Sequence, residues 1–206
     1  MGHREDLLEG AKRCLLEKGF VRTTARDIVK ESGTNLASIG YHYGSKDALL
    51  AQAYLEMIER IGEDFDGPPG EEPSGAPGSL ERFQQVWANV IETMDTARPI
   101  WLLSLEVVTQ ADRMPGVREH LAKASIEGRS GLIPMFQGGA EPERDDPVVS
   151  SLGGLYQALL NGLMIQWAFD PDTATDAEKL TEGMRLLIEG ARKADSGGSA
   201  EQTSQA

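Results

Sequence analysis

Polar and aromatic side chains gather between residues 23 and 50, in the stretch TTARDIVKESGTNLASIGYHYGSKDALL. The Ser38 hydroxyl can donate or accept a hydrogen bond at a base edge. The phenol of Tyr41, the imidazole of His42 and the ammonium of Lys46 are suited to phosphate oxygens. Lys46 also falls in the first turn of an expected helix, where free backbone N–H groups favour an anion. These residue types predict a surface that can contact nucleic acid.

Capping residues divide this stretch into short helices. Thr24 precedes ARDIVKES, and Asp27 follows it three residues later, which forms a variant of the capping box. Gly33 ends that helix after two turns, Asn35 can cap the next helix, LASIGYH, and Ser45 can cap a fourth. Two helices of two turns joined by a tight turn with glycine predict a helix-turn-helix motif over 24–43. The second helix of such a motif lies in the DNA major groove.

Apolar spacing predicts which face of the motif is buried. The preceding helix is expected over 5–18, with Gly19 ending it as a C-terminal cap would. The residues expected to pack against it are Ile28, Val29, Leu36 and Ile39. The residues left for the outer face are Asn35, Ala37, Ser38, Gly40, Tyr41 and His42. Ala37 and Gly40 are small enough to let the helix backbone approach base edges. The alternative is a three-helix packing unit with capped ends and no DNA contact.

Charge is distributed unevenly along the 206 residues. The whole chain has a net charge of −13, which argues against nucleic acid at first sight. Residues 1–50 hold eight Lys/Arg and seven Asp/Glu, whereas the other 156 residues hold 12 and 26, for net charges of +1 and −14. Such asymmetry indicates an interaction surface at one end. A near-neutral segment can bind DNA if its few cations converge on one face, and its salt dependence would then be shallow.

Helical patterns continue through the remainder of the chain, without a convincing strand. The Pro/Gly-rich stretch over 66–79 is the clearest boundary. Further helical stretches are expected at about 80–96, 99–111, 116–136, 148–169 and 176–193. We predict an all-α protein of about nine helices, with a helix-turn-helix domain over 1–62, a second helical domain over 63–194 and a disordered tail over 195–206.

Several function classes lack their sequence signatures. The single cysteine, Cys14, allows no disulfide within the chain and is expected to be a buried apolar residue. The N-terminus has no apolar signal segment, and the uncharged stretch over 147–169 has scattered polar residues and acidic flanks, so we expect a cytoplasmic protein without a membrane span. No metal-ligand spacing, phosphate loop or nucleophile elbow is present, which predicts no cofactor and no enzyme activity.

The residues from about 4 to 62 resemble the DNA-binding segment of the TetR family of bacterial transcriptional regulators. The positions that the resemblance implies as DNA contacts are Thr24, Arg26, Ala37, Ser38, Tyr41, His42 and Lys46. Gly40 departs from the tyrosine often found at its position. The resemblance implies a repressor that binds a palindromic operator as a dimer and is released by a small molecule. The alternative is a helical dimeric module that binds another protein and no longer binds DNA.

Dimerisation is also expected from the last two helical stretches. The stretch over 148–169 is apolar nearly all round, which a solvent-facing helix cannot be. The residues predicted at a homodimer interface are Leu152, Tyr156, Leu160, Leu163, Met164, Met184 and Leu187. Paired recognition helices would then lie about one DNA turn apart. The alternative is that both helices are buried within a single subunit.

A small-molecule pocket is expected in the second domain. Its predicted lining combines large apolar side chains with two polar ones, namely Phe83, Trp87, Met94, Trp101, Glu106, Gln110 and Phe136. As a set they favour an apolar or aromatic effector, with Glu106 and Gln110 placed to orient it or to pair with a cation. The alternative for each apolar residue is ordinary core packing.

Overall fold

The computed structural model describes residues 2–66 and 73–203, and every regular element in these ranges is helical. The α-helices are α1 (His3–Arg22), α2 (Ala25–Ser32), α3 (Leu36–Tyr43), α4 (Lys46–Glu63), α5 (Leu80–Thr96), α6 (Arg98–Gln110), α7 (Pro115–Gln137), α8 (Gly154–Phe169) and α9 (Ala177–Thr203). A π-helix over Val149–Gly153 leads into α8. The predicted all-α fold is confirmed.

Two segments predicted from the sequence extend beyond the residues that the structure describes. Residues 67–72 of the expected boundary over 66–79 lie outside them, and α5 begins directly after this stretch, at Leu80. Helix α9 runs to Thr203, into the stretch for which the sequence predicts a disordered tail. No proline interrupts the chain between 177 and 203, so nothing blocks continuation of the helix sterically. Residues 204–206 lie outside the described residues.

Helix α1 bends sharply at Gly19. This glycine has φ 77° and ψ 177°, so the regular helix stops there, as the sequence predicts, and a short turn continues to Arg22. A positive φ of this size favours glycine over residues with a Cβ atom. The bend is closed by Thr23, whose Oγ1 donates to the carbonyl of Gly19 at 2.6 Å. The direction in which the chain enters α2 therefore depends on this bend.

The apolar interior consists of two clusters. The first is formed by the four helices α1, α2, α3 and α4. It also contains Leu103 of α6 and Val117 of α7, each at most 5 % exposed. The second lies among α5 to α9 and the end of α4, and it is rich in aromatic residues such as Trp87, Trp101 and Phe136. Because the first cluster draws on α6 and α7, the helix-turn-helix unit packs directly on the rest of the chain.

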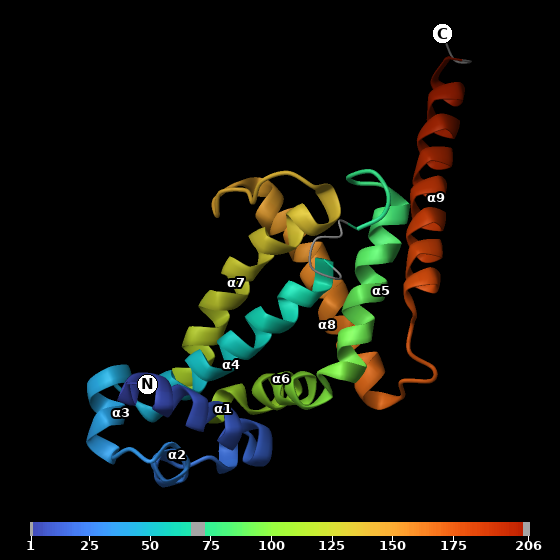
Figure 1. Cartoon of the computed structure of the whole chain (residues 1–206). Coiled ribbons are helices and arrows are strands. Elements are labelled where there is room, and N and C mark those ends of the chain that lie inside the picture. The colour runs from blue at the N-terminus through green and yellow to red at the C-terminus, as the bar shows by residue number, and fades with distance from the viewer. Residues whose placement is uncertain (1, 67–72, 204–206) are drawn as a thin grey trace.

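The helices form a small unit at one end and a larger body beside it (Figure 1). We call residues 2–45, with α1 to α3, the head, and residues 73–203, with α5 to α9, the body. Helix α4 leads from the head into the body, and α6 lies where the two meet (Figure 1). Helix α9 extends beyond the other helices (Figure 1). None of the described helices is both long and apolar enough to cross a membrane.

Candidate nucleic-acid interface and effector-binding region

Helix α3 presents most of the predicted face, but two of its residues differ from the prediction. Leu36 is 53 % exposed and Tyr41 85 %, whereas Ser38 is only 9 % exposed. Ala37 and Gly40 are exposed as predicted, and Ile39 is buried. The buried and exposed roles expected of Ser38 and Leu36 are therefore exchanged. The reason is the helix phase, because Ile39 and Ser38 face inward together and turn Leu36 outward beside Ala37 and Gly40.

Side-chain caps hold the short helices of the motif. Asn35 begins α3 by accepting a hydrogen bond at Oδ1 from the Ser38 amide, at 3.1 Å. Thr24 begins α2, with its Oγ1 accepting from the Asp27 amide at 3.2 Å and donating to the Asp27 carboxylate at 2.6 Å. Each short helix thus gains a partner for an end N–H group that its own backbone cannot satisfy.

The start of α2 also carries a paired charge. The Lys18 ammonium donates to Asp27 at 2.7 Å. This hydrogen bond, followed by those from Thr24, holds the pKa of Asp27 well below its usual range. The predicted contacts Thr24 and Arg26 are both exposed at this corner of the head. The structure therefore brings a hydroxyl and a guanidinium together beside the N-terminus of α2.

The ammonium group of Lys46 already has two contacts within the chain. Its Nζ donates to the carbonyl of Thr23 at 3.2 Å and lies 3.5 Å from the carboxylate of Asp47. The side chain is 34 % exposed, so it is not fully extended into solvent. An ammonium has three donors, and the contact with Thr23 uses one of them. Lys46 can therefore both fix the approach to α2 and reach an anion.

The aromatic residues at the end of α3 have separate roles. The rings of Tyr41 and His42 meet edge to face at 4.8 Å between centroids, on the exposed side. Tyr43, which we did not predict as a site residue, donates its hydroxyl to the carbonyl of Arg4 at 2.6 Å. The Arg4 guanidinium lies over the Tyr43 ring, at 5.6 Å. Tyr43 thus ties the recognition helix to the start of α1, a long-range contact without a local sequence signal.

The large apolar residues predicted to line a pocket form a packed core instead. Each of the five is at most 7 % exposed, namely Phe83, Trp87, Met94, Trp101 and Phe136. The ring of Phe136 lies 5.7 Å from that of Phe83, 5.4 Å from that of Trp87 and 4.0 Å from that of Tyr156. One polar atom in this cluster, Trp87 Nε1, is buried without a hydrogen-bond partner among the described residues. Buried donors are nearly always paired, so an unpaired one is unusual. The Trp87 N–H group is therefore free to donate to an acceptor on a bound molecule.

The two polar residues predicted for the pocket lie elsewhere. Gln110 accepts a hydrogen bond from Arg113 at 3.1 Å, close to the end of its own helix. Glu106 points toward the bend of α1, where its carboxylate accepts from the amides of Phe20 and Val21, each at 3.1 Å. Their spacing of one helical turn is as predicted, but the contacts of Glu106 are with the head rather than with the aromatic cluster.

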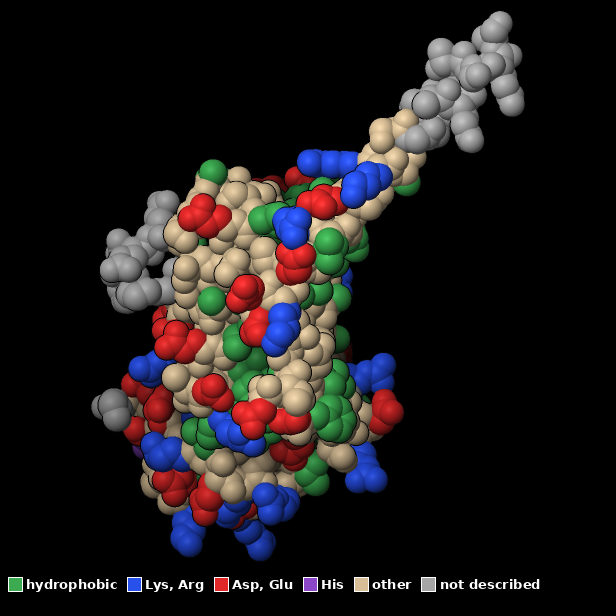
Figure 2. Space-filling view, turned by 90° about the vertical axis from the view of Figure 1, so that its right-hand side faces the viewer, with side chains coloured by type: hydrophobic (Ala, Val, Ile, Leu, Met, Phe, Trp, Pro, Cys, Tyr) green, Lys and Arg blue, Asp and Glu red, His purple; other side chains and the backbone are tan. Residues whose placement is uncertain are grey.

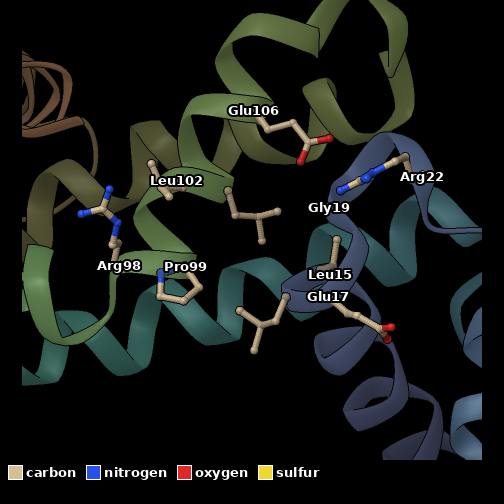
Figure 3. Close-up of a pocket in the computed structure, with 10 residues that line it drawn as sticks. Leu15, Glu17, Gly19, Arg22, Arg98, Pro99, Leu102 and Glu106 are labelled. Atoms are coloured by element: carbon tan, nitrogen blue, oxygen red, sulfur yellow. The ribbon is translucent and has the colours of Figure 1, made fainter. Parts of the chain in front are cut away.

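A groove lies between α1 and α6, beside Glu106. It encloses about 310 Å³, and its lining consists of Leu15, Leu16, Glu17, Gly19, Arg22, Arg98, Pro99, Leu102, Leu103 and Glu106. Figure 3 shows the Glu106 side chain reaching from α6 toward Gly19 and Arg22 of α1. A second, smaller hollow of about 190 Å³ includes Phe20 and Lys46. Both hollows lie where head and body meet.

The predicted dimer residues divide into buried and accessible ones. Tyr156, Leu163 and Met164 are at most 5 % exposed and belong to the core of the chain instead. Leu152, Leu160 and Met184 are partly buried against that core, and Leu187 is 66 % exposed. On α8 and α9, the exposed large apolar residues beyond those predicted are Leu155, Ile165, Phe169 and Leu186. Figure 2 shows apolar side chains among charged ones on the face that carries α9.

Comparisons with known proteins agree with this geometry. A family model described as "Bacterial regulatory proteins, tetR family" matches residues 7–53. The chain is 33 % identical over 200 residues to the HTH-type transcriptional repressor AcnR of Corynebacterium glutamicum, covering 93 % of this chain and 94 % of that one. Its fold is similar to that of the multidrug binding protein EbrR. In the complex with imidazole the TM-score is 0.64, at 23 % identity, over 89 % of this chain and 88 % of that one. In the complex with proflavin it is 0.62, at 22 % identity, over 90 % and 99 %.

Proposed function

The chain belongs to the tetR family of bacterial regulatory proteins, and on this premise we propose that it binds a palindromic operator as a homodimer and releases it on binding a small apolar or aromatic effector. Transcriptional repression through a DNA-binding helix-turn-helix is the common activity of such relatives, which are not enzymes. The observation that carries the proposal is the exposed face of α3, formed by Leu36, Ala37, Gly40 and Tyr41.

This face suits the major groove in both shape and chemistry. Ala37 and Gly40 leave room for base edges, and the Leu36 side chain can contact a thymine methyl group. Tyr41 stands out from the head and can donate to a phosphate. Figure 2 shows Lys and Arg side chains along the lower edge of the molecule, where the head lies. Packing of the head does not require the exposed Tyr41 hydroxyl or the exposed Arg26 guanidinium. We therefore favour DNA binding over the protein-interaction module.

Selection of bound duplexes from a randomised DNA pool tests the proposal. We expect a two-fold-symmetric motif whose half-sites lie one DNA turn (~34 Å) apart. The salt dependence of binding should be shallow, because the basic side chains of the head are nearly balanced by acidic ones. Lys46→Ala should weaken binding to all duplexes by a similar factor, since a phosphate contact carries no sequence information. Enrichment of no motif would favour the protein-interaction module instead.

The exposed apolar residues of α8 and α9 support a homodimer. Ile165, Phe169, Leu186 and Leu187 are between 44 % and 87 % exposed, on the two helices that the sequence predicts at an interface. Burying such side chains against a second copy would remove apolar surface from water. Sedimentation analysis of Leu187→Glu tests this surface. The wild type should sediment as a dimer and the variant mainly as a monomer, whereas an unchanged dimer would place the interface elsewhere.

The aromatic cluster of the body is the proposed effector site. Solved relatives of this fold hold imidazole or proflavin, and the cluster offers matching flat apolar surface. The closed packing of Phe83, Trp87 and Phe136 implies that an effector must displace these rings rather than enter an open cavity. The unpaired Trp87 N–H favours an effector with a hydrogen-bond acceptor.

A screen by tryptophan fluorescence tests the effector proposal, since all three tryptophans lie in the body. A true effector must quench or shift this emission and weaken operator binding. Linkage requires that operator DNA weaken effector binding by the same factor by which the effector weakens operator binding. In Trp87→Phe, effectors with an acceptor should bind about tenfold more weakly, and those without one should bind unchanged. No compound that meets both criteria would sink this part of the proposal.

A further inference from the structure

We propose that Glu106 is a positioning residue that holds the head in one orientation on the body by clamping the bend of α1. Its two carboxylate oxygens are each used once, with Oε2 accepting from the Phe20 amide and Oε1 from the Val21 amide. These amides follow Gly19 directly, where the backbone leaves the helical conformation. A charged acceptor makes a stronger hydrogen bond than a neutral one. The proposal rests on the proposed function only for its consequence in DNA binding.

Gly19 leaves room for the Glu106 carboxylate to approach the bend of α1. A Cβ atom at this position would lie 2.3 Å from Glu106 Oε2, and the φ of 77° would be strained for any other residue. The glycine therefore serves both the bend and the approach of the carboxylate (Figure 3). The sequence predicts the end of a helix at Gly19 but gives no sign of the side chain that closes on it from 87 residues further along.

A second contact from α6 reaches the same bend. The Phe20 ring meets that of Tyr54 of α4 edge to face, at 5.5 Å between centroids. The Tyr54 hydroxyl donates to Ser104 of α6 at 2.7 Å, and Phe20 is only 1 % exposed. From one helix, Glu106 therefore contacts the Phe20 amide directly, and Ser104 contacts the Phe20 ring only through Tyr54. A shift of α6 would move both contacts together.

The clamped residues lead directly to the DNA-contacting corner. Thr23 follows Val21 by two positions, and its carbonyl accepts from Lys46 at 3.2 Å. Thr24 then caps α2. The path from Glu106 to the start of the helix-turn-helix is thus continuous through residues 20–24. Because α6 also contributes Trp101 to the aromatic cluster, the same helix contacts both proposed sites.

Hydrogen exchange and an intrachain distance test the clamp without needing DNA. Glu106→Ala should speed exchange at the Phe20 and Val21 amides about tenfold or more, and Glu106→Gln, which keeps one carbonyl acceptor, should have a smaller effect. Gln110→Ala is the matched control, because it lies one turn further on α6 and contacts Arg113. Circular dichroism melts identify any variant that fails to fold.

The distance is measured by pulsed electron paramagnetic resonance between spin labels at Lys30→Cys in the head and Glu92→Cys in the body, in a Cys14→Ala background. Labelled chains are diluted with unlabelled ones so that only intrachain distances are recorded. We expect one narrow distribution in the parent and a clearly broader one in Glu106→Ala. A distribution unchanged by Glu106→Ala, or exchange within twofold of the parent, would overturn the proposal.

Operator binding provides the third readout. With the duplex selected by the parent, Glu106→Ala should bind about tenfold more weakly and Gln110→Ala equally well. Equal binding by Glu106→Ala would overturn a role of the clamp in DNA recognition. If the parent selects no duplex, the proposed function fails, whereas exchange and distance still decide whether Glu106 positions the head.

Discussion

The head and the body differ in how their residues are arranged for function. In the head, the exposed face of α3 carries Leu36, Ala37 and Tyr41, and short helices begin at side-chain caps such as Asn35. In the body, the aromatic residues that are best suited to a ligand are packed against one another, with Phe136 only 2 % exposed. The head therefore presents a preformed surface, whereas an effector site in the body would have to be opened.

Removing one aromatic ring should destabilise the body far more than the head. Phe136→Ala should lower the free energy of unfolding by about 3–5 kcal/mol, because it leaves a cavity among Phe83, Trp87 and Tyr156. Tyr41→Ala, at an 85 % exposed site, should change it by less than about 0.5 kcal/mol. Urea unfolding measures both. A loss below about 1 kcal/mol for Phe136→Ala would show that the cluster is already loose.

The second prediction places a carboxylate on the exposed face of the head. An added Cβ at Gly40 meets no atom within 4 Å, so a substitution there should fold normally. Gly40→Glu should weaken operator binding about 100-fold through repulsion by phosphates. Fluorescence anisotropy with labelled operator measures this, and Gly40→Ala serves as the size control. Equal affinities for the two variants would mean that this face does not approach DNA.

Local signals account for most of what the sequence predicts correctly. The caps at Thr24 and Asn35 and the glycine bend at Gly19 depend on neighbouring residues, so the short helices could be placed. The exchange of Ser38 and Leu36 shows the limit, since a helix of eight residues leaves its phase to tertiary packing. Glu106 is a stronger example of this limit. Nothing near Glu106 in the sequence indicates that its partners are the amides of Phe20 and Val21.

A third prediction concerns the cap of the recognition helix. Asn35→Ala removes the acceptor of the Ser38 amide and should cost about 1 kcal/mol of stability. For a chain of this size the melting temperature should fall by roughly 2–4 °C. Differential scanning calorimetry measures the change, with Asn35→Asp as a control that retains a capping oxygen. An equal loss in both variants would argue against the cap as its cause.

The smallest expected effect is a pH dependence confined to the head. The pKa of Asp27 is held down first by Lys18 and then by Thr24, so it lies below the unfolded value of about 3.9. The stabilisation by this carboxylate is therefore present above about pH 4 and is lost as the pH falls through the folded pKa. The stability difference between wild type and Asp27→Asn should be larger at pH 6 than at pH 3. Urea unfolding at the two pH values tests this, and equal differences would contradict it.

Operator binding by Tyr41→Ala and by Ser38→Ala tests directly which face of α3 contacts DNA. The exposed face of α3 predicts that Tyr41→Ala weakens binding about tenfold or more, whereas Ser38→Ala, at a 9 % exposed site, stays within about twofold of the wild type. Melting temperatures serve as the control for folding. Weaker binding by Ser38→Ala and wild-type binding by Tyr41→Ala would show that the recognition helix meets DNA with the face assigned here to the core.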